Sequence, residues 1–180
     1  IYMLLPDSQI QELLRQSGLI DEKTMQNVIV SAENARIPLQ EAVIDKNVVA
    51  DEKLGQLIAS YIKYPFVNLS KSSIPEDVYK IVPERLARKY KVIAFAKDNL
   101  RISLAMADPV HIKIADSISK KTGQKVTVFM ATERNIDNIL QLYKRNLQTT
   151  FDELLQQEIT RTNTTMDDAP IIKIVDLLIA

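Results

Sequence analysis

The sequence predicts an α/β protein of the α+β kind, in which an N-terminal layer of repeated helices precedes a small α/β sandwich of three or four strands packed by helices. Three observations indicate this fold. Apolar residues follow a helical period through the first sixty-odd residues. The same segment matches itself at an offset of 29 residues. From residue 65 onward, apolar runs of strand length alternate with helical patterns, as expected for strands covered by helices.

Residues 1–64 are predicted to form a duplicated helical unit. The first copy matches the second in two places, GLIDEKTM (18–25) with NVVADEKL (47–54) and IQELL (10–14) with LQEAV (39–43). One such pair of helices cannot bury its apolar stripe alone, so we expect the two copies to pack together as one layer.

The turns inside the two copies have matching chemistry. One helix is predicted to end at Gly18 in the first copy and at Asn47 in the second, because these residue types best suit a left-handed C-terminal cap. After each cap, a short apolar crossing leads to an acidic helix start at Asp21 or Asp51. We therefore expect the two helices of each copy to pack against one another with the same geometry.

Residues 65–146 are predicted to form a small α/β domain. Asp98 and Asn99 favour a hairpin turn between two β-rich runs. Gly123 suits the C-cap of one helix, and Thr132 the N-cap of the next. The predicted elements are, in chain order, a strand over 65–69, helices beginning near Pro75 and Pro83, a hairpin of strands over 92–97 and 100–107, a helix over 109–122, a strand over 125–131 and a helix over 132–145.

Residues 147–168 are predicted to be a polar linker, although a few apolar residues in its first half favour a brief amphipathic helix. Residues 169–180 are predicted to start the next domain, which is truncated, because an apolar pattern is still running at the last residue. The chain also begins with isoleucine. We therefore expect it to be an excised piece of a longer protein.

Composition argues against several classes of protein. Lys plus Arg and Asp plus Glu are equal at 23 each, so no net charge draws the chain toward nucleic acid. The absence of cysteine removes disulfides and thiolate metal sites, and it favours a cytoplasmic setting. No apolar run reaches the roughly 18 residues of a membrane helix, and the first residues lack the features of a signal peptide. We expect no direct insertion into a membrane.

The sequence has few residues that could form a cofactor or metal site. The three glycines, Gly18, Gly55 and Gly123, do not pair at the spacing of a phosphate-cradling loop. The single histidine, His111, cannot supply the paired imidazoles of a zinc site, and no serine lies in a Gly-x-Ser-x-Gly turn. We therefore expect no catalytic residue, cofactor or metal in this piece, and no enzyme activity from it.

The stretch LAMADPVHIKIAD (104–116) holds Asp108, Pro109 and His111 within four residues, which suggests an acid beside a base. Backbone chemistry favours a structural interpretation. Asp108 lies where a strand ends, so its carboxylate can accept amide hydrogen bonds from a helical turn that Pro109 starts. His111 would lie in that same turn. Asp108 and Pro109 are predicted to form a helix cap.

The run PERLARKYK (83–91) interleaves basic residues with Tyr90, a composition that could serve nucleic-acid binding. The spacing favours a packed helix instead. Leu86 and Tyr90, four residues apart, are predicted to form the buried face, with the basic side chains solvated. We expect no nucleic-acid partner.

The segment VPERLARKYKVIAFAKDNLRISLAMADPVHIKIADSISKKTGQKVTVFMATERNIDNILQLY (82–143) resembles the MshEN-type N-terminal domain of the traffic ATPases that power type II secretion and type IV pilus extension. A Pro-Glu-x-x-Ala-like segment, a hairpin, Ala-Met-Ala-Asp-Pro, a helix, a Thr-Gly turn and a closing strand and helix occur in the order typical of that family. The duplicated unit with YPFVNL (64–69) is similar to the paired motifs that precede this domain. DDAPIIKIVDLLIA (167–180) resembles the linker and first helix of the domain that leads into the motor.

This resemblance implies that the present chain has a function other than catalysis. In that family, ATP and Mg belong to a C-terminal motor that forms a hexamer, and that part is missing here. The N-terminal region would dock the motor onto the cytoplasmic domains of inner-membrane platform proteins and would contact its own ATPase domain. The implied location is cytoplasmic, peripheral at the bacterial inner membrane through these partners.

Some members of the family bind cyclic di-GMP between the helical repeats, through an Arg-Leu-Gly-like motif at the start of each unit and a glutamine at its end. The corresponding positions here are Gln9-Ile10-Gln11 with Ala32, and Pro38-Leu39-Gln40 with Tyr61. Both copies lack the guanidinium that would bind the dinucleotide and the glycine that would let it approach. Two hypotheses follow, a docking module and, as the alternative, a cyclic di-GMP sensor that regulates the ATPase.

Overall fold

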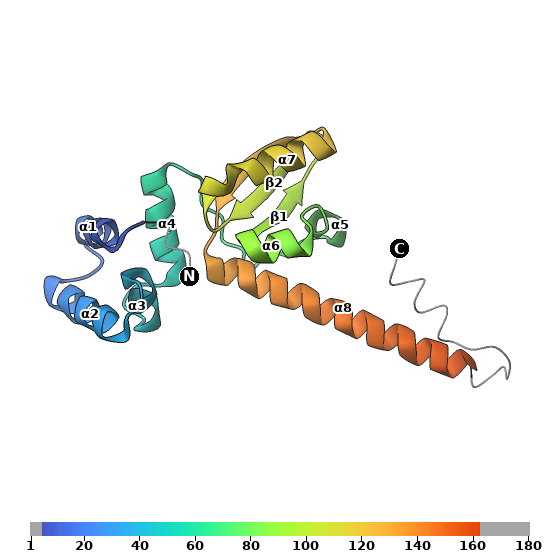
Figure 1. Ribbon diagram of the computed structural model, residues 1–180, viewed down its shortest axis with the longest axis horizontal. Coiled ribbons are helices and arrows are strands. Elements are labelled where there is room, and N and C mark those ends of the chain that lie inside the picture. The colour runs from blue at the N-terminus through green and yellow to red at the C-terminus, as the bar shows by residue number, and fades with distance from the viewer. Residues whose placement is uncertain (1–4, 163–180) are drawn as a thin grey trace. The chain divides into compact units, whose positions relative to one another are not determined.

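The computed structural model describes residues 5–162. A layer of helices comes first along the chain, and a sheet with covering helices follows it (Figure 1). The α+β fold class predicted from the sequence is confirmed. The chain divides into two compact units, of which the first extends to Ile139 and the second starts at Leu140.

Apolar faces of four helices meet in the core of the helical layer, where Ile10, Met25 and Ile58 have no exposed surface. Asp21 caps the second of these helices, because its carboxylate accepts a hydrogen bond from the Thr24 backbone N–H at 2.8 Å. The layer is therefore a single core shared by two helix pairs. Its helices are α1 (Asp7–Ser17), α2 (Glu22–Ala35), α3 (Leu39–Asp45) and α4 (Asp51–Ile62).

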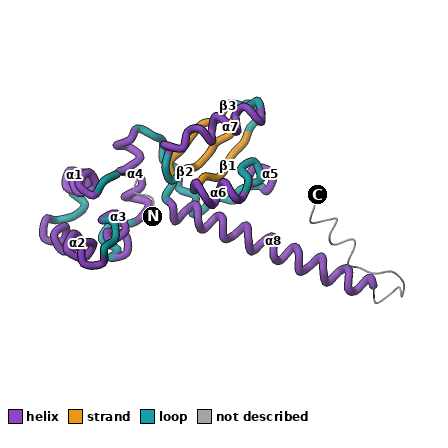
Figure 2. Tube along the Cα trace, viewed as in Figure 1, coloured by secondary structure: helices purple, strands orange, loops and turns teal. Residues whose placement is uncertain are grey.

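The sheet has the strand order β1-β2-β3. Its strands are β1 (Val92–Lys97), β2 (Arg101–Met106) and β3 (Lys125–Met130). β1 and β2 form an antiparallel hairpin, and β3 lies parallel to β2 on its other side. A parallel neighbour needs a crossover, which is supplied by the 3₁₀ turn η1 (Pro109–His111) and the helix α7 (Ile112–Thr122) (Figure 2). The central strand carries the fully buried side chains of Ile102, Leu104 and Met106.

The strand predicted over 65–69 is reduced to one parallel bridge, between Phe66 and Met130. The backbone of Met130 exchanges hydrogen bonds of 2.7 and 2.9 Å with the residues on either side of Phe66. Pairing stops there because β3 ends at Met130, and the Leu69 N–H donates instead to the Asn135 side chain at 2.8 Å. Over the described residues the sheet therefore has three strands and not four.

Two short helices, α5 (Glu76–Tyr79) and α6 (Glu84–Tyr90), precede β1. The prediction that Leu86 lies on the buried face of α6 is wrong, because Leu86 is 38% exposed. Ala87 faces inward instead and is 1% exposed, while Tyr90 is half-buried. Ala87 is the buried residue of this seven-residue helix, and its small side chain lets the helix backbone approach the core closely.

The last helix, α8 (Glu133–Thr162), is longer than the helix predicted over 132–145. It continues through 147–162, which the sequence predicts as a linker, because no glycine or proline interrupts it. The rest of the predicted linker (163–168) and the predicted start of the next domain (169–180) lie outside the described residues. Within the part of the chain that the structure describes, no helix has the length and apolar character needed to cross a membrane.

Candidate functional site

The residues predicted as caps lie at the ends of separate elements. Gly18 ends α1 with a φ of 65°, Asn47 follows α3 with a φ of 53°, and Gly123 ends α7 with a φ of 70°. Asp108 precedes η1, and Pro109 is the first residue of that turn. The structure thus distributes these residues over different turns and does not bring them together in one site.

The Asp108 side chain holds the turn that follows β2. One carboxylate oxygen accepts a hydrogen bond from the Val110 N–H at 2.9 Å, and the other lies 3.8 Å from Nδ1 of His111. Pro109 starts a 3₁₀ turn, and the α-helical part begins only at Ile112. Because both oxygens of Asp108 face groups of this turn, the carboxylate stabilises a strand-to-helix connection.

The helical layer meets the sheet domain at Gly55 on α4. A Cβ atom at this position would lie 2.7 Å from Cγ2 of Thr132 and 2.8 Å from Cε2 of Phe66, which is closer than such atoms pack. Glycine therefore permits the close approach of α4. Thr132 is itself held in place, because its Oγ1 accepts a hydrogen bond from the Asn135 N–H at 3.2 Å in the first turn of α8.

Ion pairs join the start of α8 to its neighbours. Arg134 pairs with Asp45, the last residue of α3. The Nζ atom of Lys91, which lies between α6 and β1, is 2.5 Å from Asp137 and 3.4 Å from Glu133. Burial alone would lower the pKa of Lys91, but the hydrogen bond and charge of Asp137, with those of Glu133, outweigh burial and raise it. Lys91 is therefore charged at neutral pH and tethers α8 to the sheet domain.

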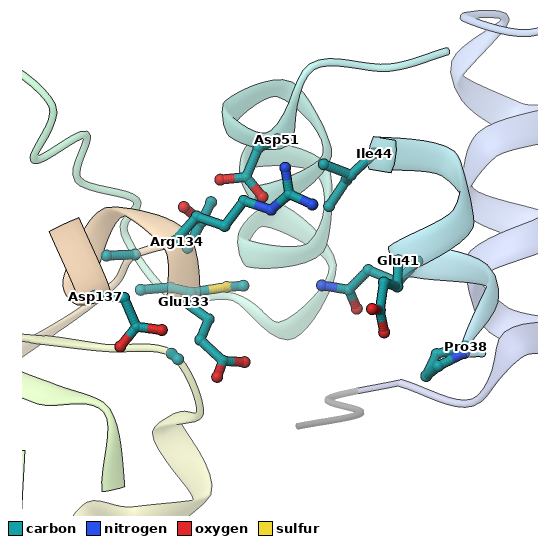
Figure 3. A pocket seen from close by; sticks show the side chains of 13 residues that line it. Pro38, Glu41, Ile44, Asp51, Glu133, Arg134 and Asp137 are labelled. Carbon is teal, nitrogen blue, oxygen red and sulfur yellow. The ribbon is translucent and has the colours of Figure 1, made fainter. Parts of the chain in front are cut away.

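A cavity of about 280 Å³ lies at this junction (Figure 3). Arg134 extends across it from α8 toward the helical layer. Buried side-chain oxygens of Gln40 and Glu41 have no hydrogen-bond partner among the described residues. The carboxylates that line the cavity belong to Glu41, Asp51, Glu133 and Asp137. Their excess of negative charge suits hydrogen-bond donors and cations, and it repels a phosphate.

Within residues 5–162, no group of three or more His, Asp or Glu side chains is placed to hold a metal ion. The carboxylates of the junction instead face Lys91 and Arg134 or the cavity itself.

Sequence reasoning missed this junction. Gly55 is a signal that could have indicated it, because a glycine inside a helix lowers stability and is expected where another element approaches closely. The pairing of Arg134 with Asp45 joins residues 89 positions apart, and no local pattern connects them.

Comparison with known proteins places the fold. The family model described as the MshEN domain matches residues 62–150. A type IV pilus assembly ATPase PilB from Myxococcus xanthus is 22% identical over 95% of this chain and 32% of its own length. The PilB of Thermus thermophilus is 22% identical over 71% of this chain and 14% of its own length. The chain therefore spans about a third or less of the length of these relatives.

Two solved structures share the architecture. The structure of MshE with cdg, or cyclic di-GMP, has a TM-score of 0.54 at 18% identity and covers 74% of this chain and 97% of that chain. The N-terminal domain of XpsE has a TM-score of 0.50 at 15% identity and covers 78% of this chain and 97% of that chain. At these identities the likeness concerns the fold alone.

Proposed function

Because residues 62–150 of this chain are an MshEN domain and the chain is homologous to type IV pilus assembly ATPases, we propose that it is the N-terminal docking and regulatory region of such an ATPase. In this proposal it links a hexameric secretion or pilus motor to the cytoplasmic domains of inner-membrane platform proteins. It is itself non-catalytic, acts in the cytoplasm and reaches the membrane only through these partners.

The observation that carries the proposal is the close junction between the helical layer and the sheet domain. A docking region that couples a motor to a platform must transmit displacement without slipping between its own parts. Gly55 packs directly against Thr132 and Phe66, and the ion pair of Arg134 with Asp45 joins α8 to α3. Both halves belong to one compact unit that extends to Ile139, at the start of α8.

ATP and Mg are assigned to another part of the full-length protein in this proposal. The glycines present here have other uses: Gly18 and Gly123 end helices with positive φ, and Gly55 admits α4 to the junction. None of them lies in a loop that could cradle a phosphate.

Calorimetry against the purified cytoplasmic domain of each platform protein tests the docking function. We expect saturable binding by at least one of them, and no binding by a cytoplasmic domain taken from an unrelated membrane protein. A failure of every platform domain to bind the folded chain would contradict the proposal.

A second candidate function is cyclic di-GMP sensing, which the fold likeness to MshE with cdg favours. The motif positions in this chain oppose it. Gln9 and Pro38 stand where the arginines would, Gln11 and Gln40 where the glycines would, and the buried Ala32 where the first unit would end in glutamine. The exposed Tyr61 stands where the second unit would end in glutamine. No guanidinium replaces the missing arginine at either position.

Isothermal titration decides between the two candidates. We expect no heat above dilution when cyclic di-GMP is added to the folded chain, and the same result with cyclic di-AMP as the control ligand. Saturable micromolar binding of cyclic di-GMP alone would establish the sensor function, and the platform titration would still decide the docking function.

A further inference from the structure

Exposed apolar side chains gather where α6 meets η1. Leu86 is 38% exposed, Val110 75% and Ile112 42%. Tyr90 lies one turn after Leu86 on α6, and its ring packs 5.1 Å, measured between centroids, from the ring of His111, which lies between Val110 and Ile112 in the sequence. We refer to Leu86, Tyr90, Val110 and Ile112 as the α6–η1 patch.

The strand-to-helix turn does not require this patch. Asp108 caps the turn, and Pro109 restricts the backbone to the φ that the turn needs. Neither contribution requires an apolar residue at 110 or 112. Turns that face water ordinarily carry polar residues. Adjoining apolar side chains left in solvent instead mark a surface that another molecule covers.

The surroundings of the patch are basic. Arg85, Lys89 and Lys113 adjoin patch residues in the sequence and are exposed. The Nζ atom of Lys89 lies 5.0 Å from the centre of the Tyr90 ring. A basic rim around an apolar centre favours an acidic partner with an apolar face.

We propose that the α6–η1 patch is the docking surface of this region, and that its partner is an acidic amphipathic segment of a platform protein. The apolar face of that segment covers Val110 and Ile112, and its carboxylates face Arg85 and Lys113. This inference rests on the proposed docking function and names the surface and the chemistry of the partner. Binding to an anionic membrane surface, which basic residues also favour, is a separate outcome that the vesicle arm of the test distinguishes.

The test uses calorimetry of the folded chain against the platform domain that binds it, at low and at physiological ionic strength. The variants Val110→Ser with Ile112→Ser, and Arg85→Glu with Lys113→Glu, remove the apolar centre and the basic rim separately. We expect each pair to weaken binding at least tenfold, and wild-type binding to weaken as salt is added.

Matched controls lie elsewhere on the chain. Leu100→Ser removes an apolar side chain that is 74% exposed in the hairpin turn, outside the patch, and Lys53→Glu reverses an exposed charge on α4. We expect both to bind within twofold of wild type. Binding by the patch variants within twofold of wild type would overturn the surface assignment and leave the docking function standing.

A second probe keeps the inference testable if no platform domain binds and the docking function itself fails. It is a designed helical peptide with leucines on one face and glutamates on the other, compared with its lysine counterpart. Binding of the glutamate peptide alone, lost in Val110→Ser with Ile112→Ser, supports the patch, and binding of neither peptide overturns it. Patch-dependent binding to phosphatidylglycerol vesicles, or patch-dependent self-association in sedimentation, would also overturn the assignment of a protein partner.

Discussion

Gly55 shows how one residue sets the spacing between two layers of the fold. Ala is the better helix former by up to about 1 kcal/mol, so the helix alone would gain from Gly55→Ala. The added Cβ would meet Cγ2 of Thr132 at 2.7 Å and Cε2 of Phe66 at 2.8 Å, and the Thr132 side chain is held by its hydrogen bond from the Asn135 N–H. Overpacking of this kind costs about 1–3 kcal/mol. At this position packing outweighs helix propensity.

We therefore expect Gly55→Ala to lower the free energy of unfolding by about 1 kcal/mol, the overpacking cost less the gain in helix propensity, as measured by urea denaturation. Gln56→Ala, at the adjacent exposed position of α4, is the matched control and should change stability by less than about 0.5 kcal/mol. Unchanged or increased stability in Gly55→Ala would show that α4 does not need this close approach.

Asp108 supports a prediction about its turn. Asp108→Ala removes the acceptor of the Val110 N–H and should cost about 0.5–2 kcal/mol of stability, as loss of a cap usually does. Asp108→Asn keeps an acceptor oxygen and should lose less. Binding to a platform domain should persist in both variants once they are folded. A loss of binding without a loss of stability would assign Asp108 to the interface instead.

At the scale of elements, the β1–β2 hairpin links stability to pH. The Asp98 carboxylate accepts hydrogen bonds from the Leu100 and Arg101 N–H groups, each at 2.7 Å, and these bonds lower the pKa of Asp98. A lowered pKa means that the folded state favours the charged form. The stabilisation is therefore present above the ordinary pKa of an aspartate and is lost as pH falls through the lower folded value.

Thermal unfolding should consequently show a steeper loss of stability for the wild type than for Asp98→Asn between about pH 5 and about pH 3. The asparagine variant keeps an acceptor but has no charge to titrate. Parallel pH profiles for the two proteins would mean that the hydrogen bonds of Asp98 do not depend on its charge.

The elements also show which parts of the fold could be read from the sequence. The hairpin, the crossover helix and β3 were predictable because alternation, the cap residues and Gly123 are local signals. The extent of α8 was missed because polar composition was interpreted as a linker, whereas the absence of proline and glycine allowed the helix to continue. The prediction that Leu86 is buried was wrong because a helix of seven residues can pack on the core through Ala87 alone.

At the scale of the first compact unit, the junction combines groups that no single segment contains. Arg134 of α8 pairs with Asp45 of α3. Asp137 of α8 pairs with Lys91, which lies between α6 and β1. The caps were predictable because their partners lie within a few residues. The junction and its cavity were not, because their geometry exists only after distant segments have packed.

The ion pair of Arg134 with Asp45 can be tested by a double-mutant cycle. Both side chains are about half exposed, at 54% and 49%, so we expect a coupling energy of about 0.2–1 kcal/mol. Arg134→Glu should destabilise the chain, and Arg134→Glu with Asp45→Arg should recover part of that loss at low salt. Additive effects of the two changes would show that the pair does not join α3 to α8.

The junction also dictates an order of events during synthesis. The helical layer and the hairpin each contain their own contacts, the longest-range hydrogen bond among the described residues of the layer spanning 32 positions, so each can form once its own residues have left the ribosome. The contact of Leu69 with Asn135 spans 66 positions, and that of Arg134 with Asp45 spans 89. Neither can form until the start of α8 has emerged. The nascent chain must therefore carry an open Gly55 face until Thr132 and the start of α8 have emerged, and this face is where we expect a chaperone to act.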